Sequence, residues 1–262
     1  MLKALKLASL LTDPAFGWRR RGPRILIYHQ VGAESGLEMD VTIDDFEWQL
    51  DWMIRNGNIV DLETALARVG DPGSESMYVL TFDDGHRSLF HNAFPLMHER
   101  GLPFTLYVTT APLESDRLLH GHTEMRLSSW EDIQRMHETG LMTIGAHGHR
   151  HLDARAHSRS VLEQDFERCN VLLRERLDIE PRHFAYPWGH RSRAAESLVR
   201  VLYQTAVVGS GPEFNATTDR HRIPRIPVMH SDGWSLLFAR KMWGGFRLEV
   251  TLRSIRDLMR GS

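Results

Sequence analysis

Short apolar runs alternate along this chain with segments whose apolar residues recur at helical spacing. Runs of about five apolar residues bounded by turn signals are typical of buried strands, and a three-to-four residue period is typical of amphipathic helices. Regular alternation of the two predicts βαβ units, a parallel sheet and, at six or seven repeats in one domain, a barrel. The predicted strands cover residues 24–28, 78–82, 104–109, 141–146, 183–186, 205–208 and 223–228.

Helix start and stop signals lie between these runs. Thr42 begins a segment that resembles a capping box, and the helix it opens is predicted to end at Gly57. Ser128 with Glu131 predicts the start of another helix, which Gly140 ends. Further helical faces are predicted over residues 94–101, 162–173, 194–203 and 248–259.

Length, net charge and cysteine count limit the number of domains and the kinds of binding site that this chain can have. The chain has 262 residues, which suits one large α/β domain better than two small ones. Its formal net charge of -2 argues against broad electrostatic capture of nucleic acid, so we expect no nucleic-acid partner. Cys169 is the only cysteine, which excludes an intrachain disulfide and a cysteine-based zinc site.

The first 22 residues are predicted to be an extension before the main domain, which covers residues 23–262. Their apolar stretch is short and Lys6 interrupts it, which argues against a cleavable signal peptide. Leu2, Leu5 and Leu10 could form one face of an amphipathic helix beside basic residues, either docked on the core or lying on a membrane surface. We therefore expect a cytoplasmic enzyme, or one peripheral to the inner membrane.

Two adjacent carboxylates, Asp83 and Asp84, follow the second predicted strand and precede Gly85. In a parallel barrel the carboxyl ends of the strands build the active site. Adjacent residues on a bending strand end point in different directions, so one carboxylate could bind a metal while the other faces substrate. The alternative is a solvated Asp-Gly turn.

A second group of polar residues, His147-Gly148-His149-Arg150-His151, also follows an apolar strand. On one helical turn His147 and His151 would share a face and could ligate one ion. Two histidines and one aspartate leave a coordination position open, which is typical of catalytic zinc.

Two more strand ends carry candidate groups. The segment Phe184-Ala185-Tyr186-Pro187-Trp188-Gly189 ends in a turn whose backbone N–H groups could serve as an oxyanion hole. His29 follows Tyr28 at the end of the first strand. A single histidine there is usually structural, but its alignment with the other strand-end groups favours a catalytic role.

Taken together, TFDDG at 81–85, the histidines at 147 and 151, and FAYPWG at 184–189 resemble the polysaccharide deacetylase family, also called NodB-homology or family-four carbohydrate esterases. The resemblance implies an α/β fold, a distorted (β/α)7-type barrel. It implies a metal bound by Asp84, His147 and His151, with Asp83 as catalytic base and the Trp188 N–H at the oxyanion.

The chain departs from the family pattern in two places. Ala185 stands where an arginine usually orients the base, and Arg182 or Arg225 could replace that arginine. The usual C-terminal Leu-His pair is absent. Members with a permuted motif order, similar to poly-N-acetylglucosamine deacetylases, instead carry an early Tyr-His, and Tyr28-His29 matches it. The resemblance therefore implies His29 as the catalytic acid.

The expected reaction is metal-assisted hydrolysis of the N-acetyl group of an amino sugar in a polysaccharide, oligosaccharide or glycan precursor. Zinc is the first expectation, although the donor set would also accept cobalt, nickel, manganese or iron. We expect Tyr186, Pro187, Trp188 and Arg225 to contact the N-acetylated carbohydrate. The expected compartment fits the synthesis of a surface polysaccharide better than trimming of a finished external polymer.

Three alternatives remain open at the level of sequence. The first is a metal-dependent amidohydrolase acting on a cyclic ureide or imide. The second is deacetylation of a lipid-linked or formylated sugar at the membrane. The third is a non-catalytic carbohydrate-binding protein, against which the complete set of acid, base and metal ligands argues.

Overall fold

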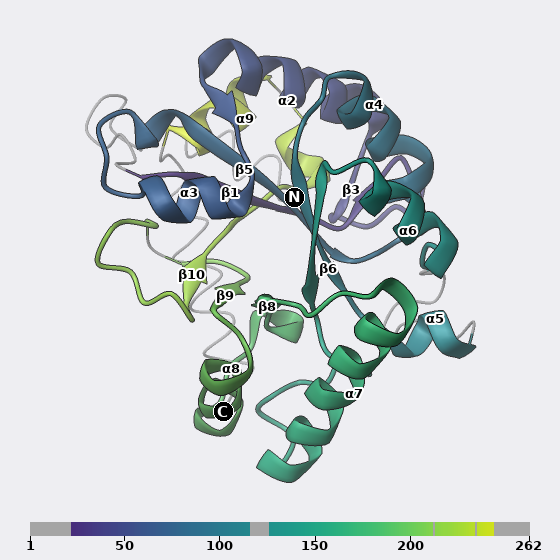
Figure 1. Cartoon of the computed structure of the whole chain (residues 1–262). Coiled ribbons are helices and arrows are strands. Elements are labelled where there is room, and N and C mark those ends of the chain that lie inside the picture. The colour runs from purple at the N-terminus through teal and green to yellow at the C-terminus, as the bar shows by residue number, and fades with distance from the viewer. Residues whose placement is uncertain (1–21, 116–125, 212, 234, 244–262) are drawn as a thin grey trace.

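The centre of the computed structural model, which describes residues 22–115, 126–211, 213–233 and 235–243, is a sheet of parallel strands (Figure 1). The strand order is β10-β9-β8-β7-β6-β5-β1-β11, and β4 also pairs with β5. The strands are β1 (Arg24–Tyr28), β4 (Asn58–Ile59), β5 (Met77–Asp84), β6 (Phe104–Val108), β7 (Met142–Ala146), β8 (His183–Ala185), β9 (Thr205–Val208), β10 (Ile223–Pro224) and β11 (Ile226–Pro227). A separate small sheet pairs β2 (Gln30–Val31) with β3 (Asp40–Val41).

The two ends of the strand order meet in one extended segment. Only Arg225 separates β10 from β11, and β10 pairs with β9 while β11 pairs with β1. Residues 223–227 therefore act as a single strand that closes the ring, giving the seven-stranded barrel that the sequence predicts. Pro224 and Pro227 lack backbone N–H groups, so this seam has fewer ladder hydrogen bonds than an ordinary strand.

Helices lie around the outside of the strands (Figure 1). Thr42 caps the first of them as predicted, because its side chain accepts a hydrogen bond from the Asp45 N–H. The predicted start at Ser128 is wrong by one residue: Ser129 and Asp132 form the capping box, while Ser128 is buried and bonds to Gly85 and His86. The helices are α2 (Ile43–Asn56), α3 (Leu62–Arg68), α4 (Phe94–Glu99), α5 (Ala111–Ser115), α6 (Trp130–Glu138), α7 (Arg159–Leu177), α8 (Arg193–Leu202) and α9 (Ser235–Met242).

Short helical turns complete the described part of the chain. The helix predicted over 94–101 begins earlier, as the π-helical turn η2 (Leu89–Ala93) that runs into α4. Three 3₁₀ turns are η1 (Ser74–Ser76), η3 (Pro187–Gly189) and η4 (His230–Asp232). The turn η3 follows β8 and carries part of the predicted site.

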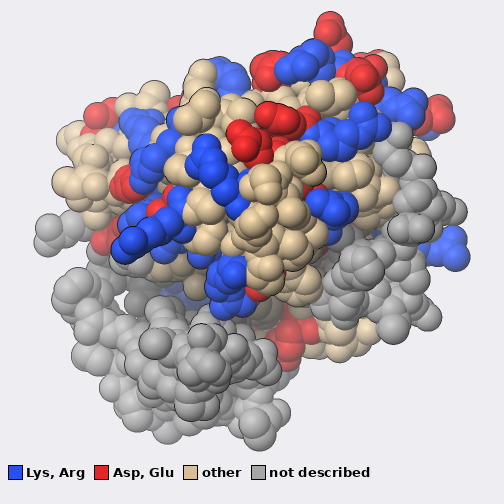
Figure 2. Space-filling view, turned by 90° about the horizontal axis from the view of Figure 1, so that it is seen from below, with Lys and Arg blue, Asp and Glu red and all other residues tan. Residues whose placement is uncertain are grey.

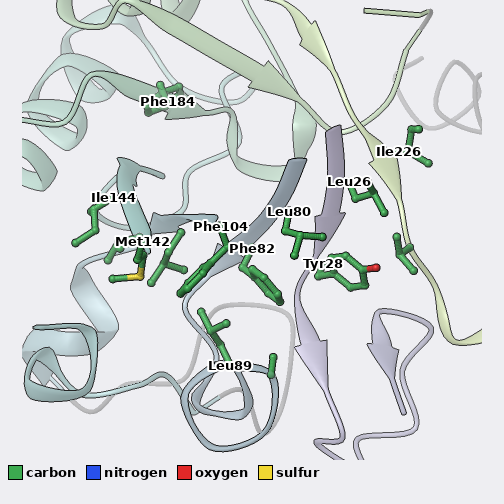
Figure 3. Close-up of a cluster of buried hydrophobic side chains, with 14 of the residues drawn as sticks. Leu26, Tyr28, Leu80, Phe82, Leu89, Phe104, Met142, Ile144, Phe184 and Ile226 are labelled. Carbon is green, nitrogen blue, oxygen red and sulfur yellow. The ribbon is translucent and has the colours of Figure 1, made fainter. Parts of the chain in front are cut away.

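Alternating side chains of the strands form two separate apolar layers. Leu26, Tyr28, Leu80 and Phe82 belong to the larger cluster, which packs between the strands and the helices (Figure 3). The intervening residues of the same strands enter a second cluster with α3, which contains Ile25, Val79, Tyr107, Ala185 and Val207. This period of two places every second side chain inside the barrel.

Several remaining expectations concern the surface and the ends. Among the helices that are described, none is long and apolar enough to cross a membrane. The predicted N-terminal amphipathic helix and the last helix, over 248–259, lie outside the described residues. Figure 2 shows basic and acidic side chains mixed over the described part of one face, without one sign of charge covering it.

Candidate active site

The end of β5 places Asp83 inside the barrel. Val79, Thr81 and Asp83 alternate along β5, and Val79 belongs to the interior cluster. Asp83 therefore continues the inward row at the carboxyl end, where it is buried. Its two carboxylate oxygens each accept a hydrogen bond of 2.6 Å from an amino nitrogen of Arg225.

Of the two arginines considered in place of Ala185, Arg225 is the one that pairs with Asp83. Its guanidinium is buried, and besides the bidentate pair it donates to the Thr81 hydroxyl at 3.1 Å and to the Val208 carbonyl at 3.1 Å. Arg182, the other candidate, is wrong for this role, because it lies at the surface beside Glu63 and Gln204. The buried position of Arg225 favours orientation of the base over direct contact with substrate.

The pair determines the charge state of Asp83. Burial alone would raise the pKa of its carboxyl, but the Arg225 guanidinium, followed by His147, holds that pKa well below its usual range. Asp83 is consequently ionised at neutral pH and can accept a proton.

Tyr107 supports Arg225, and the sequence analysis did not identify it. Asp83 and Tyr107 are register partners on β5 and β6, and the Arg225 guanidinium lies 5.4 Å from the centre of the Tyr107 ring. On the next strand a Cβ at Gly145 would come within 2.5 Å of that ring, so only glycine leaves room for it. A tyrosine in an apolar strand is typical of a buried core residue, and the local sequence contains no signal for its contact with Arg225.

Asp84, His147 and His151 form a group that could hold a metal ion. The nearest ligand atoms of the three all lie within 4.8 Å of one another. Asp84 Oδ1 lies 3.6 Å from His147 Nε2 and 3.4 Å from His151 Nε2. Asp84 has a positive φ of 70°, which turns its side chain away from the direction that strand alternation would give it.

The chemistry of this group fits a metal. Asp84 Oδ1 is buried and has no hydrogen-bond partner among the described residues, which is costly unless a ligand satisfies it. His147 Nδ1 lies 2.8 Å from the Ala185 carbonyl, so it carries the proton and leaves Nε2 as a lone-pair donor. Donor separations of 3.4 to 3.6 Å suit three ligands about 2.1 Å from one ion.

The two histidines converge through a turn and not through a helical face, so that part of the sequence prediction is wrong. Residues 147–151 are not helical; Gly148 and His151 have φ values of 76° and 55°. Asp165 on α7 holds the turn by accepting hydrogen bonds from the His149 and Arg150 N–H groups. A Cβ at Gly148 would meet Asp165 at 2.9 Å, so glycine is required there for space as well as for φ.

Burial also sets the protonation of His151. It lowers the pKa of the imidazole to about 4, although the nearby Asp84 carboxylate raises it in part. A neutral imidazole at neutral pH is the form that binds a metal.

His29 lies within electrostatic reach of Asp83, Asp84, Arg225 and His147, so the predicted acid belongs to the same group. It is partly exposed, at the end of β1. Burial lowers its pKa, while the two carboxylates raise it in part. The preceding Tyr28 is fully buried and bonds to Gln49, which anchors the strand end beneath His29.

Comparisons with known proteins identify the family of the chain. The family described as polysaccharide deacetylase matches residues 70–207 of the chain, which is more than half of it. The chain belongs to the polysaccharide deacetylase family.

Two curated relatives are both named poly-beta-1,6-N-acetyl-D-glucosamine N-deacetylase. The Staphylococcus epidermidis protein is 24% identical over 233 residues, which cover 82% of this chain and 76% of the relative. The Escherichia coli protein is 22% identical over 267 residues, 85% of this chain but 38% of the relative. The solved structure of IcaB from Ammonifex degensii has a TM-score of 0.72 and 25% identity, covering 86% of this chain and 98% of that one.

The family match covers only part of the group. Asp83, Asp84, His147 and His151 lie inside residues 70–207, whereas His29 and Arg225 lie outside them. The barrel brings both residues close to the matched ones. β1 pairs with β5, and the closing strand pairs with β1. His29 and Arg225 therefore come from the segments that complete the barrel outside the matched residues.

The turn after β8 carries one exposed aromatic residue, and the two residues before it are buried. The Trp188 side chain is 45% exposed, its ring centre lies 4.9 Å from that of His151, and its indole N–H donates to the His151 carbonyl. Tyr186 and Pro187 are buried, and Tyr186 packs on Phe184. Of the predicted substrate contacts in this turn, Trp188 presents a surface, while the other two lie beneath it as support.

Proposed function

We propose that this chain is a metal-dependent deacetylase that hydrolyses the N-acetyl group of an amino sugar in a polysaccharide, oligosaccharide or glycan precursor. The observation that carries the proposal is the buried, unpartnered Oδ1 of Asp84 between two imidazole nitrogens, directly beside an ionised Asp83. Family membership supports the reaction class, and the similarity to two N-acetylglucosamine polymer deacetylases supports the sugar.

Asp84, His147 and His151 would hold the ion, leaving a position open toward solvent and substrate. When bound, a divalent ion supplies Lewis acidity, which polarises an acetyl carbonyl and lowers the pKa of water. Zinc suits two imidazoles and a carboxylate best, with cobalt, nickel, manganese or iron as alternatives.

The proton transfers belong to the residues of the chain. Asp83, kept ionised by Arg225, accepts a proton from the attacking water. His29 gives a proton to the departing amine, and a lowered pKa makes its protonated form a stronger acid. The backbone N–H of Trp188 is proposed as the oxyanion donor, a contribution typically worth about 3 kcal/mol.

Trp188 is also proposed as the surface on which a sugar ring stacks, since its indole is exposed beside His151. For the compartment, we keep the expectation of a cytoplasmic or membrane-apposed enzyme acting on a precursor of a surface glycan.

The test is acetate release from a panel of N-acetylated sugars by the zinc-loaded protein, compared with Asp83→Asn. The expected result is release by the wild type and a loss of about 10²- to 10⁴-fold in the variant, the range of general acid–base catalysis. Inclusion of cyclic ureides and imides tests the neighbouring amidohydrolase reaction. Hydrolysis of those compounds alone, or metal-loaded protein that releases acetate from no sugar, would overturn the proposal.

A further inference from the structure

An open cavity adjoins the candidate active site on the side of β7 and β8. It measures about 290 Å³ and is lined by Arg155, Glu196 and the run from Gly189 to Arg193. Gly189 directly follows Trp188, whose ring contacts the metal-ligand candidate His151. The cavity therefore begins one residue beyond the proposed sugar-stacking surface.

Its lining carries more positive than negative charge. Arg155, Arg191 and Arg193 face a single acidic lining residue, Glu196. Glu196 is already engaged, because it accepts hydrogen bonds from both Arg191 and Arg222. Within the described part of the chain, Arg193 makes no hydrogen bond or ion pair, and it is exposed.

The positive groups are held in place from beneath. Asp153 accepts from Arg155 at 2.8 Å and lies 3.1 Å from His190 Nδ1, so one carboxylate orients two of the lining side chains. The cavity also lies at the N-terminus of α8, where Ser192 accepts from the Ala195 N–H and the positive end of the helix dipole adds to the side-chain charges. Because Asp153 and Glu196 already pair with Arg155 and Arg191, Arg193 and the N-terminus of α8 supply the uncompensated positive charge of the lining, which favours a ligand with negative charge.

Resting on the proposed function, we infer that this cavity binds an anionic group carried by the glycan close to the N-acetyl sugar, as a carboxylate or a phosphate. Its volume is near the lower limit of about 300 Å³ for ligand pockets, which suits one charged group or one acidic sugar and not a whole oligosaccharide. A polymer of N-acetylglucosamine carries no such charge, so the preferred substrate differs in charge from the polymer named for the relatives.

The experiment compares kcat/KM for acetate release by the zinc-loaded full chain on three substrates of equal length. One is a neutral N-acetylglucosamine oligosaccharide, one alternates N-acetylglucosamine with a uronic acid, and one carries a sugar phosphate. We expect at least one anionic substrate to exceed the neutral one by about tenfold, with most of the difference in KM and with a decrease at high salt. The uronic-acid and phosphate arms identify the source of the charge.

The decisive variant is Arg193→Glu, with Arg168→Glu as the matched control. Arg168 is an exposed arginine on α7 outside the cavity lining. Arg193→Glu should reduce the ratio of anionic to neutral kcat/KM by about fivefold or more, and Arg168→Glu should leave that ratio unchanged. Equal kcat/KM for all three substrates in the wild type, or an equal ratio in wild type and Arg193→Glu, would overturn the inference.

A binding measurement separates this inference from the proposed function. Inorganic phosphate is titrated into the wild type and Arg193→Glu and followed by the nuclear magnetic resonance signals of the Arg side chains. Saturable binding at the cavity that Arg193→Glu weakens supports the anion site even if no sugar is deacetylated. Absence of saturable binding, together with no preference for anionic substrates, rejects the site while leaving the deacetylase proposal standing.

Discussion

The two ends of the barrel both carry a buried histidine near a carboxylate, but they arrange these groups differently. At the amino end, His183 has Thr205 at 2.8 Å from Nδ1 and Glu63 at 3.0 Å from Nε2. At the carboxyl end, Asp84 Oδ1 has two imidazole nitrogens within 3.6 Å and no hydrogen bond.

This difference distinguishes a histidine that stabilises the fold from a group of side chains arranged for a reaction. A histidine whose two ring nitrogens each have one polar neighbour is held in place as part of the fold, whereas a carboxylate oxygen between two imidazole nitrogens brings three possible metal ligands together. The residue types alone do not distinguish the ends, because both use histidine and a carboxylate. Substitutions at each end should therefore have opposite profiles: loss of activity at one and a small loss of stability at the other.

The largest effect is expected for Asp84→Asn. The amide cannot replace a charged oxygen ligand, so the variant should lose zinc and all activity above background. Zinc content after dialysis and isothermal titration with zinc measure the first effect, and acetate release measures the second. Asp83→Asn is the matched control, since it should lose activity and keep the metal. Wild-type zinc affinity in Asp84→Asn would show that Asp84 is not a ligand.

Arg225→Met should come next. Without the guanidinium, burial dominates at Asp83 and the pKa of its carboxyl rises, so the acid limb of the pH profile of kcat/KM should move to higher pH. Breaking a buried pair typically costs about 3 to 5 kcal/mol of stability.

The sign of the pH dependence follows from the lowered pKa of Asp83. The pair contributes stability above the ordinary pKa of an aspartate, and this stability is lost as pH falls toward the lower pKa of the folded state. Arg182→Met, at the surface of the amino end, should change neither the profile nor the activity. An unchanged pH profile in Arg225→Met would remove Arg225 from its positioning role.

Substitutions of Tyr107 should have a smaller effect. Two variants separate the contribution of its ring from that of its hydroxyl. Its hydroxyl is buried and has no hydrogen-bond partner among the described residues, so Tyr107→Phe should retain activity and stability. Tyr107→Leu removes the ring beneath Arg225 and should reduce kcat severalfold, in line with a cation–π contribution of about 0.5–2 kcal/mol. Equal kcat values for Tyr107→Phe and Tyr107→Leu would contradict a role for the ring in supporting Arg225.

The smallest effect is expected at the amino end. Glu63 is partly exposed, so Glu63→Gln should cost about 1 kcal/mol or less and leave kcat unchanged. Burial lowers the pKa of His183, so protonation favours the unfolded state and stability should fall as pH drops below about 6.5. Glu63 raises that pKa in part, and its removal should make the acid loss steeper in urea unfolding curves. A large loss of activity would contradict the distinction between the two ends.

Much of the site could be predicted from the sequence because its parts are local. Asp83 and Asp84 are adjacent, His147 and His151 are four residues apart, and each group follows an apolar run that reads as a strand. Carboxyl ends of parallel strands share one rim, so strand prediction alone brings these groups to one end of a barrel. In the structure, Asp84, His147 and His151 do lie close enough together to hold one metal ion.

What the sequence by itself determined is therefore the fold class, the strand ends that carry chemistry and the candidate ligand set. Only the tertiary structure decided between Arg182 and Arg225, because the choice depends on which strand closes the barrel 142 residues after Asp83. It also decided that His147 and His151 meet through a left-handed turn, and that Tyr107 lies beneath the guanidinium. Hydrophobic periodicity encodes which face of an element is buried, whereas these contacts depend on register and closure between distant strands, which no local pattern contains.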